Sequence, residues 1–189
     1  MGGIFSNFDR SEILGRELYE KWVDAYNRES GEGRKIFIPT PLNQKCVFDG
    51  ILKSCQPVYD HISVIEIKVR SSEYPSYLLE KDKLNNIFEA TSKPFYGVSQ
   101  LEEVYRNPIT DIRRFYVNII DQGNKVKYFI YNLNQIKELI DKGEIKEESG
   151  YFSKTTAVRS SGVNKAVYFL DTKYALTFTL DKNKGTFLK

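Results

Sequence analysis

The chain has 189 residues and a formal net charge of +3, with 41% hydrophobic and 28% charged residues, as in an ordinary globular protein of one domain. One histidine excludes a histidine-rich zinc centre and leaves His61 as the only histidine base for a nucleophile. No window holds the 18 apolar residues of a membrane span, nothing resembles a signal peptide, and two scattered cysteines fit reduced thiols, so we expect a cytoplasmic protein.

The first predicted element is a helix over residues 12–28, with an apolar stripe at helical spacing formed by Leu14, Leu18, Trp22 and Ala25. At about 100° per residue, Glu17 lies about 100° from the centre of this stripe and Glu20 nearly opposite it. We therefore expect Glu17 to lean over a neighbouring sheet and Glu20 to face water.

Three strands and a second helix are predicted next. Alternating or continuous apolar residues, separated by turn-forming prolines, predict strands over residues 35–38, 45–54 and 61–70. Helical spacing of apolar residues after Pro75 predicts a helix over 76–90, and a short strand is expected over 95–98.

The carboxy-terminal half is rich in predicted strands. Asp121-Gln122-Gly123-Asn124 predicts a hairpin turn between strands 114–121 and 125–131. A short helix over 134–142 and strands over 152–158 and 166–180 follow, the last bent near Asp171. Without a linker long enough to separate two units, we expect one domain over 1–189, with a core over 12–100 and a β-rich extension over 110–189.

The segment Val64–Arg70 carries charges inside an apolar strand. Its period of two places Ile65, Ile67 and Val69 on one side, and Glu66 and Lys68 on the other. A second acid, Asp49, lies within the apolar run of the preceding predicted strand. Two acids and a lysine on adjacent strands indicate a metal-dependent site that cleaves phosphodiesters.

Oxygen ligands suit Mg²⁺, so we expect Asp49, Glu66 and the Ile67 carbonyl to bind it. Lys68 shares a face with Glu66, so its ammonium group is expected to reach the attacking water or the developing negative charge. Glu17 is expected to assist as an auxiliary acid.

With Asp49 in the second strand and Glu66-Ile67-Lys68 in the third, residues 12–100 resemble the PD-(D/E)xK nuclease superfamily. The chain departs from its pattern at Phe48, where proline often stands. The resemblance implies an α/β fold with a restriction endonuclease-like α-β-β-β-α-β core, a mixed central sheet and a C-terminal β-rich part. It also implies a Mg²⁺-dependent endonuclease (Mn²⁺ as substitute) acting on DNA, of phage or bacterial type, with Lys83 as a phosphate contact.

Alternatives remain open at each point. Glu66 and Lys68 also fit a solvent-facing pair, Asp49-Gly50 fits a turn, and Asp60 competes with Asp49 as the first acid. The rival function is a catalytically silent nucleic-acid-binding, structural or regulatory protein of a phage or mobile element that keeps the fold. A homodimer fits either reading.

Overall fold

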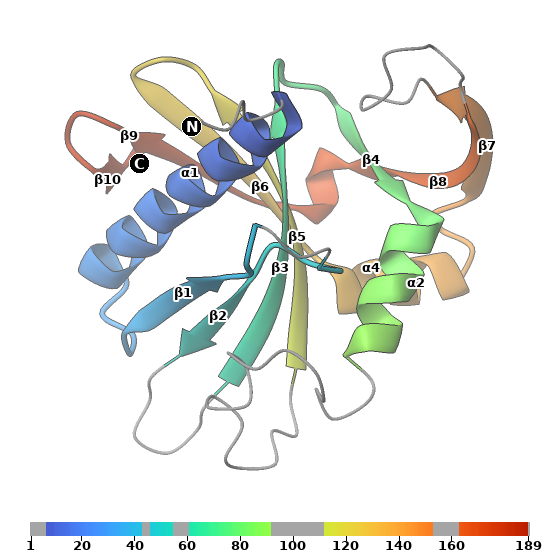
Figure 1. The fold of residues 1–189 in the computed structure, drawn as a ribbon, viewed down its shortest axis with the longest axis horizontal. Coiled ribbons are helices and arrows are strands. Elements are labelled where there is room, and N and C mark those ends of the chain that lie inside the picture. Colours follow the sequence, from blue (N-terminus) through green and yellow to red (C-terminus); the bar gives the residue numbers. More distant parts are fainter. Residues whose placement is uncertain (1–6, 43–45, 55–60, 92–111, 153–162, 189) are drawn as a thin grey trace, which may run out of the picture.

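In the computed structural model, residues 7–42, 46–54, 61–91, 112–152 and 163–188 are described (Figure 1). Within them the chain forms an α/β fold with three α-helices and two sheets. The helices are α1 (Asn7–Glu29), α2 (Lys81–Ala90) and α4 (Leu133–Asp141). No helix in this part of the chain is both long enough and apolar enough to cross a membrane.

The larger sheet has seven strands in the order β1-β2-β3-β5-β6-β9-β10. Strands from the predicted core and from the predicted extension therefore share one sheet. The strands are β1 (Lys35–Pro39), β2 (Gly50–Ser54), β3 (His61–Arg70), β5 (Ile112–Asp121), β6 (Lys125–Asn132), β9 (Leu176–Asp181) and β10 (Thr186–Phe187).

The centre of this sheet is the parallel pair of β3 and β5, with Glu66 opposite Tyr116 and Lys68 opposite Asn118. All other neighbours in the sheet are antiparallel, which makes it mixed as expected. Most side chains of the two central strands are buried on both faces, and both strands consist largely of β-branched and aromatic residues.

A smaller sheet of three antiparallel strands lies beside the first, in the order β4 (Ser76–Glu80), β8 (Val163–Asp171) and β7 (Glu147–Phe152). After β8, the chain passes through the 3₁₀ turn η1 (Thr172–Tyr174) and enters the larger sheet as β9. The break near Asp171 that the sequence predicts is confirmed, and it transfers the chain from one sheet to the other.

The two faces of the larger sheet have separate cores. Helix α1 packs on the face formed by Ile65, Ile67, Val117 and Ile119, and Gly15 allows close contact because an added Cβ would lie 3.0 Å from Ile67 Cγ2. The other face, which includes Val64 and Tyr116, is covered by α2, α4 and the smaller sheet (Figure 1). Glu66 and Lys68 belong to this second face by the alternation of β3.

Several predicted boundaries were wrong. Residues 76–90 form a strand followed by a helix, not one helix, because Tyr77 and Leu79 alternate into the core before helical spacing begins at Leu84. Strand β2 begins at Gly50 rather than at 45, which leaves Asp49 just before it. The first helix, the hairpin of β5 and β6 and the short helix α4 are confirmed to within a few residues. The predicted strand 95–98, Asp60 and Cys55 lie outside the described residues.

Candidate active site

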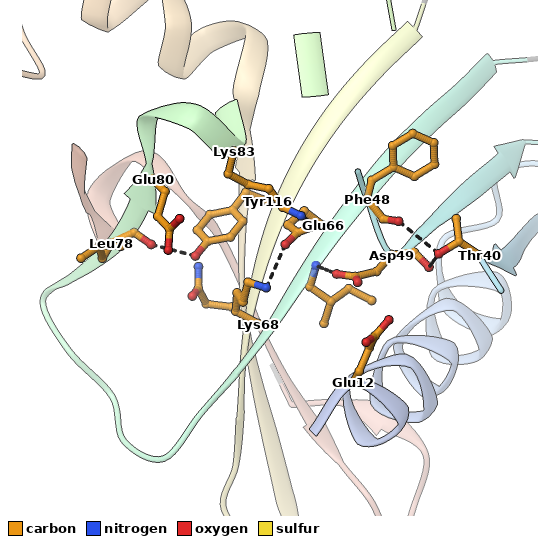
Figure 2. A network of polar contacts seen from close by, with 12 residues as sticks. Glu12, Thr40, Phe48, Asp49, Glu66, Lys68, Leu78, Glu80, Lys83 and Tyr116 are labelled. Atoms are coloured by element: carbon orange, nitrogen blue, oxygen red, sulfur yellow. Dashed lines mark hydrogen bonds and ion pairs between the residues drawn. The ribbon is translucent and has the colours of Figure 1, made fainter. Parts of the chain in front are cut away.

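Glu66 lies at the centre of the site and is completely enclosed. It is 1% exposed, and each of its carboxylate oxygens contacts a different ammonium group. Lys68 Nζ lies 2.9 Å from Oε1, and Lys83 Nζ lies 2.8 Å from Oε2 (Figure 2). The side chains of Lys68 and Lys83 are 41% and 28% exposed, so both lysines lie between the buried carboxylate and the surrounding water.

Asp49 reaches the same place from the neighbouring chain segment. Its own N–H donates to the Ile65 carbonyl at 2.9 Å, and its Oδ2 accepts the Ile67 N–H at 2.6 Å. Asp49 thus continues the hydrogen bonding along β3 beyond Gly50, the first residue of β2. The prediction that Asp49 lies inside a strand was wrong, but it lies beside Glu66 and Lys68, as Figure 2 shows.

Gly50 explains why Asp49 can take this position. A Cβ on Gly50 would lie 2.4 Å from Phe37 Cε2 and 2.9 Å from the Ile38 carbonyl oxygen. Only glycine lets β1 approach this closely, and that approach fixes the start of β2 next to the acid.

Burial, and next the negative charge of Glu66, raise the pKa of Asp49 to about 7. Burial by itself lowers the pKa of Lys68, but the charges of Glu66 and Asp49 outweigh burial and hold that pKa above its usual range. Lys68 is therefore a protonated hydrogen-bond donor and a fixed positive charge at neutral pH.

Helix α1 holds the segment that carries Asp49. Buried Arg16 donates to the carbonyl of Thr40 and, at 3.2 Å, to its hydroxyl. Thr40 in turn donates its N–H to the Asp49 carbonyl at 2.9 Å, and its hydroxyl donates to the Phe48 carbonyl at 3.1 Å. Arg16 and Thr40 were not predicted from the sequence. A charged residue, Arg16, on the buried side of a helix was the one feature that could have indicated this contact.

The helix-one acid beside the site is Glu12, and the assignment of Glu17 was wrong. Glu17 is exposed, as is Glu20, whereas Figure 2 shows Glu12 directed toward Asp49. Glu12 also pairs with Arg16 at 2.5 Å. The buried arc of α1 includes Gly15, Tyr19 and Val23, so its centre is turned by about 80° from the stripe used for the prediction.

A second polar cluster, missed in the sequence, adjoins Lys68 on the same face. Arg70 donates from Nη2 to the Tyr116 hydroxyl and from Nε to Asn118 Oδ1, both at 2.8 Å. The Tyr116 hydroxyl donates to the Leu78 carbonyl at 2.8 Å. Because Leu78 belongs to β4, this cluster fastens the smaller sheet to β3 and β5 beside the site.

The residues present fit a hard divalent cation. Two carboxylates meet at one edge of β3, and Oδ1 of Asp49 receives no hydrogen bond from the described residues. The N–H and C=O of a residue in an extended strand point to the same side, so the Ile67 carbonyl faces Asp49 as well. Three oxygen donors of this kind suit Mg²⁺ or Mn²⁺. No group of three acidic, histidine or cysteine side chains with metal-binding spacing occurs in the described part of the chain.

Comparisons with known proteins add little to this picture. No protein-family model matches the chain, and no curated protein matches it. Among solved structures, D212, a nuclease from a fusselovirus, aligns with 93% of this chain and 89% of its own, at 16% identity and a TM-score of 0.46. Similarity at this level does not establish a shared fold or activity.

Proposed function

We propose that this protein is a metal-dependent nuclease of the PD-(D/E)xK type that hydrolyses phosphodiester bonds of DNA, as an endonuclease. One observation carries the proposal: Asp49, bonded to the backbone of β3, lies within electrostatic reach of Glu66 and Lys68, which form an ion pair on that central strand. Burying a carboxylate such as Glu66 is costly, so its presence beside a second acid points to a functional role.

Asp49, Glu66 and the Ile67 carbonyl would hold Mg²⁺ or Mn²⁺, which when bound supplies an acidic water and a positive charge for the phosphate. In hydrolysis, the water oxygen bonds to phosphorus as the bond to one ester oxygen breaks. The protonated Lys68 donates to the negative phosphate oxygens and stabilises their increased charge in the transition state. Glu12, which replaces Glu17 in this proposal, assists from α1 by orienting water.

A nucleic acid suits the site because phosphate is the group that its lysines recognise, and we propose DNA as the substrate. Lys83 follows β4 on the first turn of α2 and is partly exposed beside Glu66. We propose Lys83 as a phosphate contact. The net charge of +3 adds only weak general attraction to DNA.

The test is nicking of supercoiled plasmid by purified protein with Mg²⁺, compared with EDTA. Lys68→Met and Asp49→Asn should each reduce nicking by about 100-fold or more, because the first removes the positive charge at the reacting phosphate and the second removes a charged metal ligand. Lys137→Met is the control, since Lys137 pairs with Asp141 on the exposed side of α4. Absence of nicking by the unchanged protein, or full nicking by Lys68→Met, would refute the proposal.

One observation favours the silent alternative. Both oxygens of Glu66 already contact lysines, so the cluster is neutralised without a metal. In a silent protein, the side chains of Asp49, Glu66, Lys68 and Lys83 would form an ion-pair network, and no divalent cation would bind. Calorimetric titration with Mn²⁺ separates the two, because a nuclease binds it and Asp49→Asn abolishes that binding.

A further inference from the structure

The contacts of Lys83 lead to an inference about how the site is regulated, which rests on the proposed function. Glu66 receives no hydrogen bond from the described residues other than its contacts with Lys68 and Lys83. With a side-chain exposure of 0%, its carboxylate has no open side from which a cation could enter. A metal ion that takes one of the Glu66 oxygens would therefore compete with the ammonium group already there.

The charges around Glu66 point to the same exchange. Asp49 and Glu66 carry two negative charges when ionised, and Lys68 and Lys83 carry two positive charges. A divalent cation added to this balanced cluster would be repelled by both lysines at short range. Departure of one lysine removes part of that repulsion and frees an oxygen ligand in the same step.

The geometry selects Lys83 as the group that leaves. Lys68 lies two residues after Glu66 on the same face of β3, so its ammonium group stays near the carboxylate. Lys83 comes from α2, a separate element, so although it is the less exposed of the two lysines, nothing in its own backbone keeps its ammonium group beside β3. Once displaced, it meets the phosphates of a bound strand, which restore the lost ion pair.

We propose that Lys83 is a displaceable latch, an internal cation that occupies the metal ligand Glu66 until a divalent ion and a nucleic-acid phosphate arrive together. In the resting protein it weakens metal binding. In the loaded site it contacts phosphate. Metal and nucleic acid then each strengthen the binding of the other, because the metal displaces Lys83 from Glu66 and the phosphate binds the displaced Lys83.

The test measures metal binding without nucleic acid. Mn²⁺ is titrated calorimetrically into the unchanged protein, Lys83→Met, Lys83→Arg and Lys81→Met. Lys83→Met should bind Mn²⁺ at least about tenfold more tightly, a cautious value for removing a unit charge a few ångströms from a divalent ion. Lys83→Arg should bind as weakly as the unchanged protein, because it keeps the charge.

Lys81→Met is the matched control. Lys81 lies on the same turn of α2 but pairs with Glu147, at 2.6 Å, and should leave the Mn²⁺ affinity unchanged. In the double variant Lys83→Met/Asp49→Asn, the gain should disappear if the ion binds at the proposed ligands. Thermal melting of each variant verifies that it is folded.

Each result decides the matter. Equal or weaker binding by Lys83→Met overturns the latch, and if the unchanged protein still nicks plasmid with Mg²⁺, the proposed nuclease function stands. An equal gain in Lys81→Met or Lys83→Arg also overturns the latch, since neither removes charge from Glu66. If no variant binds Mn²⁺ and none nicks plasmid, both proposals fail.

Discussion

At the level of single residues, Asp49 combines burial with a neighbouring negative charge. Its carboxylate is held by one backbone N–H and lies near Glu66, and both burial and Glu66 disfavour its ionised form. Its pKa of about 7 in the folded protein lies above the value of 3.8 for an unperturbed aspartate. The folded protein therefore binds more protons here than the unfolded chain between these two values, so the stability contributed by Asp49 falls as pH rises through this range.

Asp49→Asn should therefore stabilise the protein at pH 8 but not at pH 4. Asparagine keeps an oxygen that accepts the Ile67 N–H but carries no charge. With metal removed by EDTA, we expect a gain of about 2 kcal/mol in unfolding free energy at pH 8, allowing for partial contact with water. Urea unfolding at several pH values measures it, with exposed Asp24→Asn as control. A gain independent of pH would contradict the raised pKa.

Gly50→Ala tests the close approach of β1. The added methyl group would overlap the Phe37 ring and the Ile38 carbonyl, so we expect a loss of about 1–3 kcal/mol in unfolding free energy. The shift should also move Asp49 away from Ile67 and weaken Mn²⁺ binding. An unchanged urea midpoint would mean that Phe37 moves aside without cost.

At the level of elements, the contact between the sheets depends on Tyr116. Its hydroxyl donates to Leu78 of β4, and Arg70 donates to it from β3. Loss of this hydroxyl leaves the Leu78 carbonyl, among the described residues, with the longer Arg70 contact of 3.4 Å alone. We therefore expect β4 to open locally more often.

Tyr116→Phe should reduce the unfolding free energy by about 1–2 kcal/mol and speed hydrogen exchange in β4. Tyr128→Phe is the matched control, since its buried hydroxyl donates to the Leu18 carbonyl at the same 2.8 Å but faces α1. Both should lose similar stability, while only Tyr116→Phe should speed exchange in β4. Equal exchange in both variants would argue against this role.

Elements also mark how far the sequence could be interpreted. Hairpin β5–β6 could be predicted because its turn and alternation are local. Leu18, Trp22 and Ala25 of the predicted α1 stripe are buried, as expected. The width of the buried side was misjudged, because burial of Tyr19, Val23 and polar Arg16 depends on contacts with strands and with Thr40. Residues 76–80 were wrongly predicted as helix because their partner strand β8 lies about 90 positions later in the sequence and gives no local signal.

At the level of the whole molecule, the two ends of the described chain stabilise each other. Glu29 of α1 accepts the Phe187 N–H at 2.7 Å, and Arg28 donates to the Gly185 carbonyl. Trp22 stacks against Tyr26, makes a T-shaped contact with Phe178 and packs at a tilt against Phe187. Helix α1, which holds the Asp49 segment through Arg16, is thereby fixed by the last strands.

Phe187→Ala should loosen this contact. We expect a loss of about 1–2 kcal/mol in unfolding free energy, because the ring is only partly buried. Trp22, the single tryptophan of the chain, should show a red-shifted emission as water reaches it. Leu188→Ala, an exposed neighbour, should change neither quantity. An unshifted emission spectrum would show that the packing of α1 around Trp22 does not depend on β10.

The candidate site illustrates the same limit over the whole chain. Asp49, Glu66 and Lys68 could be brought together from sequence because Asp49 adjoins the strand next to β3 and a period of two places Glu66 and Lys68 on one face. Arg70, Tyr116 and Asn118 could not, because the parallel pairing of β3 with β5 joins residues almost 50 positions apart. Lys83 was predicted as a phosphate contact, but its ion pair with Glu66 could not be predicted, because it depends on the position that β4 gives to α2.

The transfer of the chain from β8 to β9 has a consequence for synthesis. The smaller sheet covers the face of Glu66 only when β8 has paired with β4, and β9 and β10 then complete the sheet and fasten α1. When synthesis has reached Phe152 at the end of β7, every proposed catalytic side chain has been made, but β8, which completes the smaller sheet over this face, has not. During synthesis, the active centre would therefore assemble only after the residues of β8, β9 and β10 (163–187) have been made, well after its own side chains.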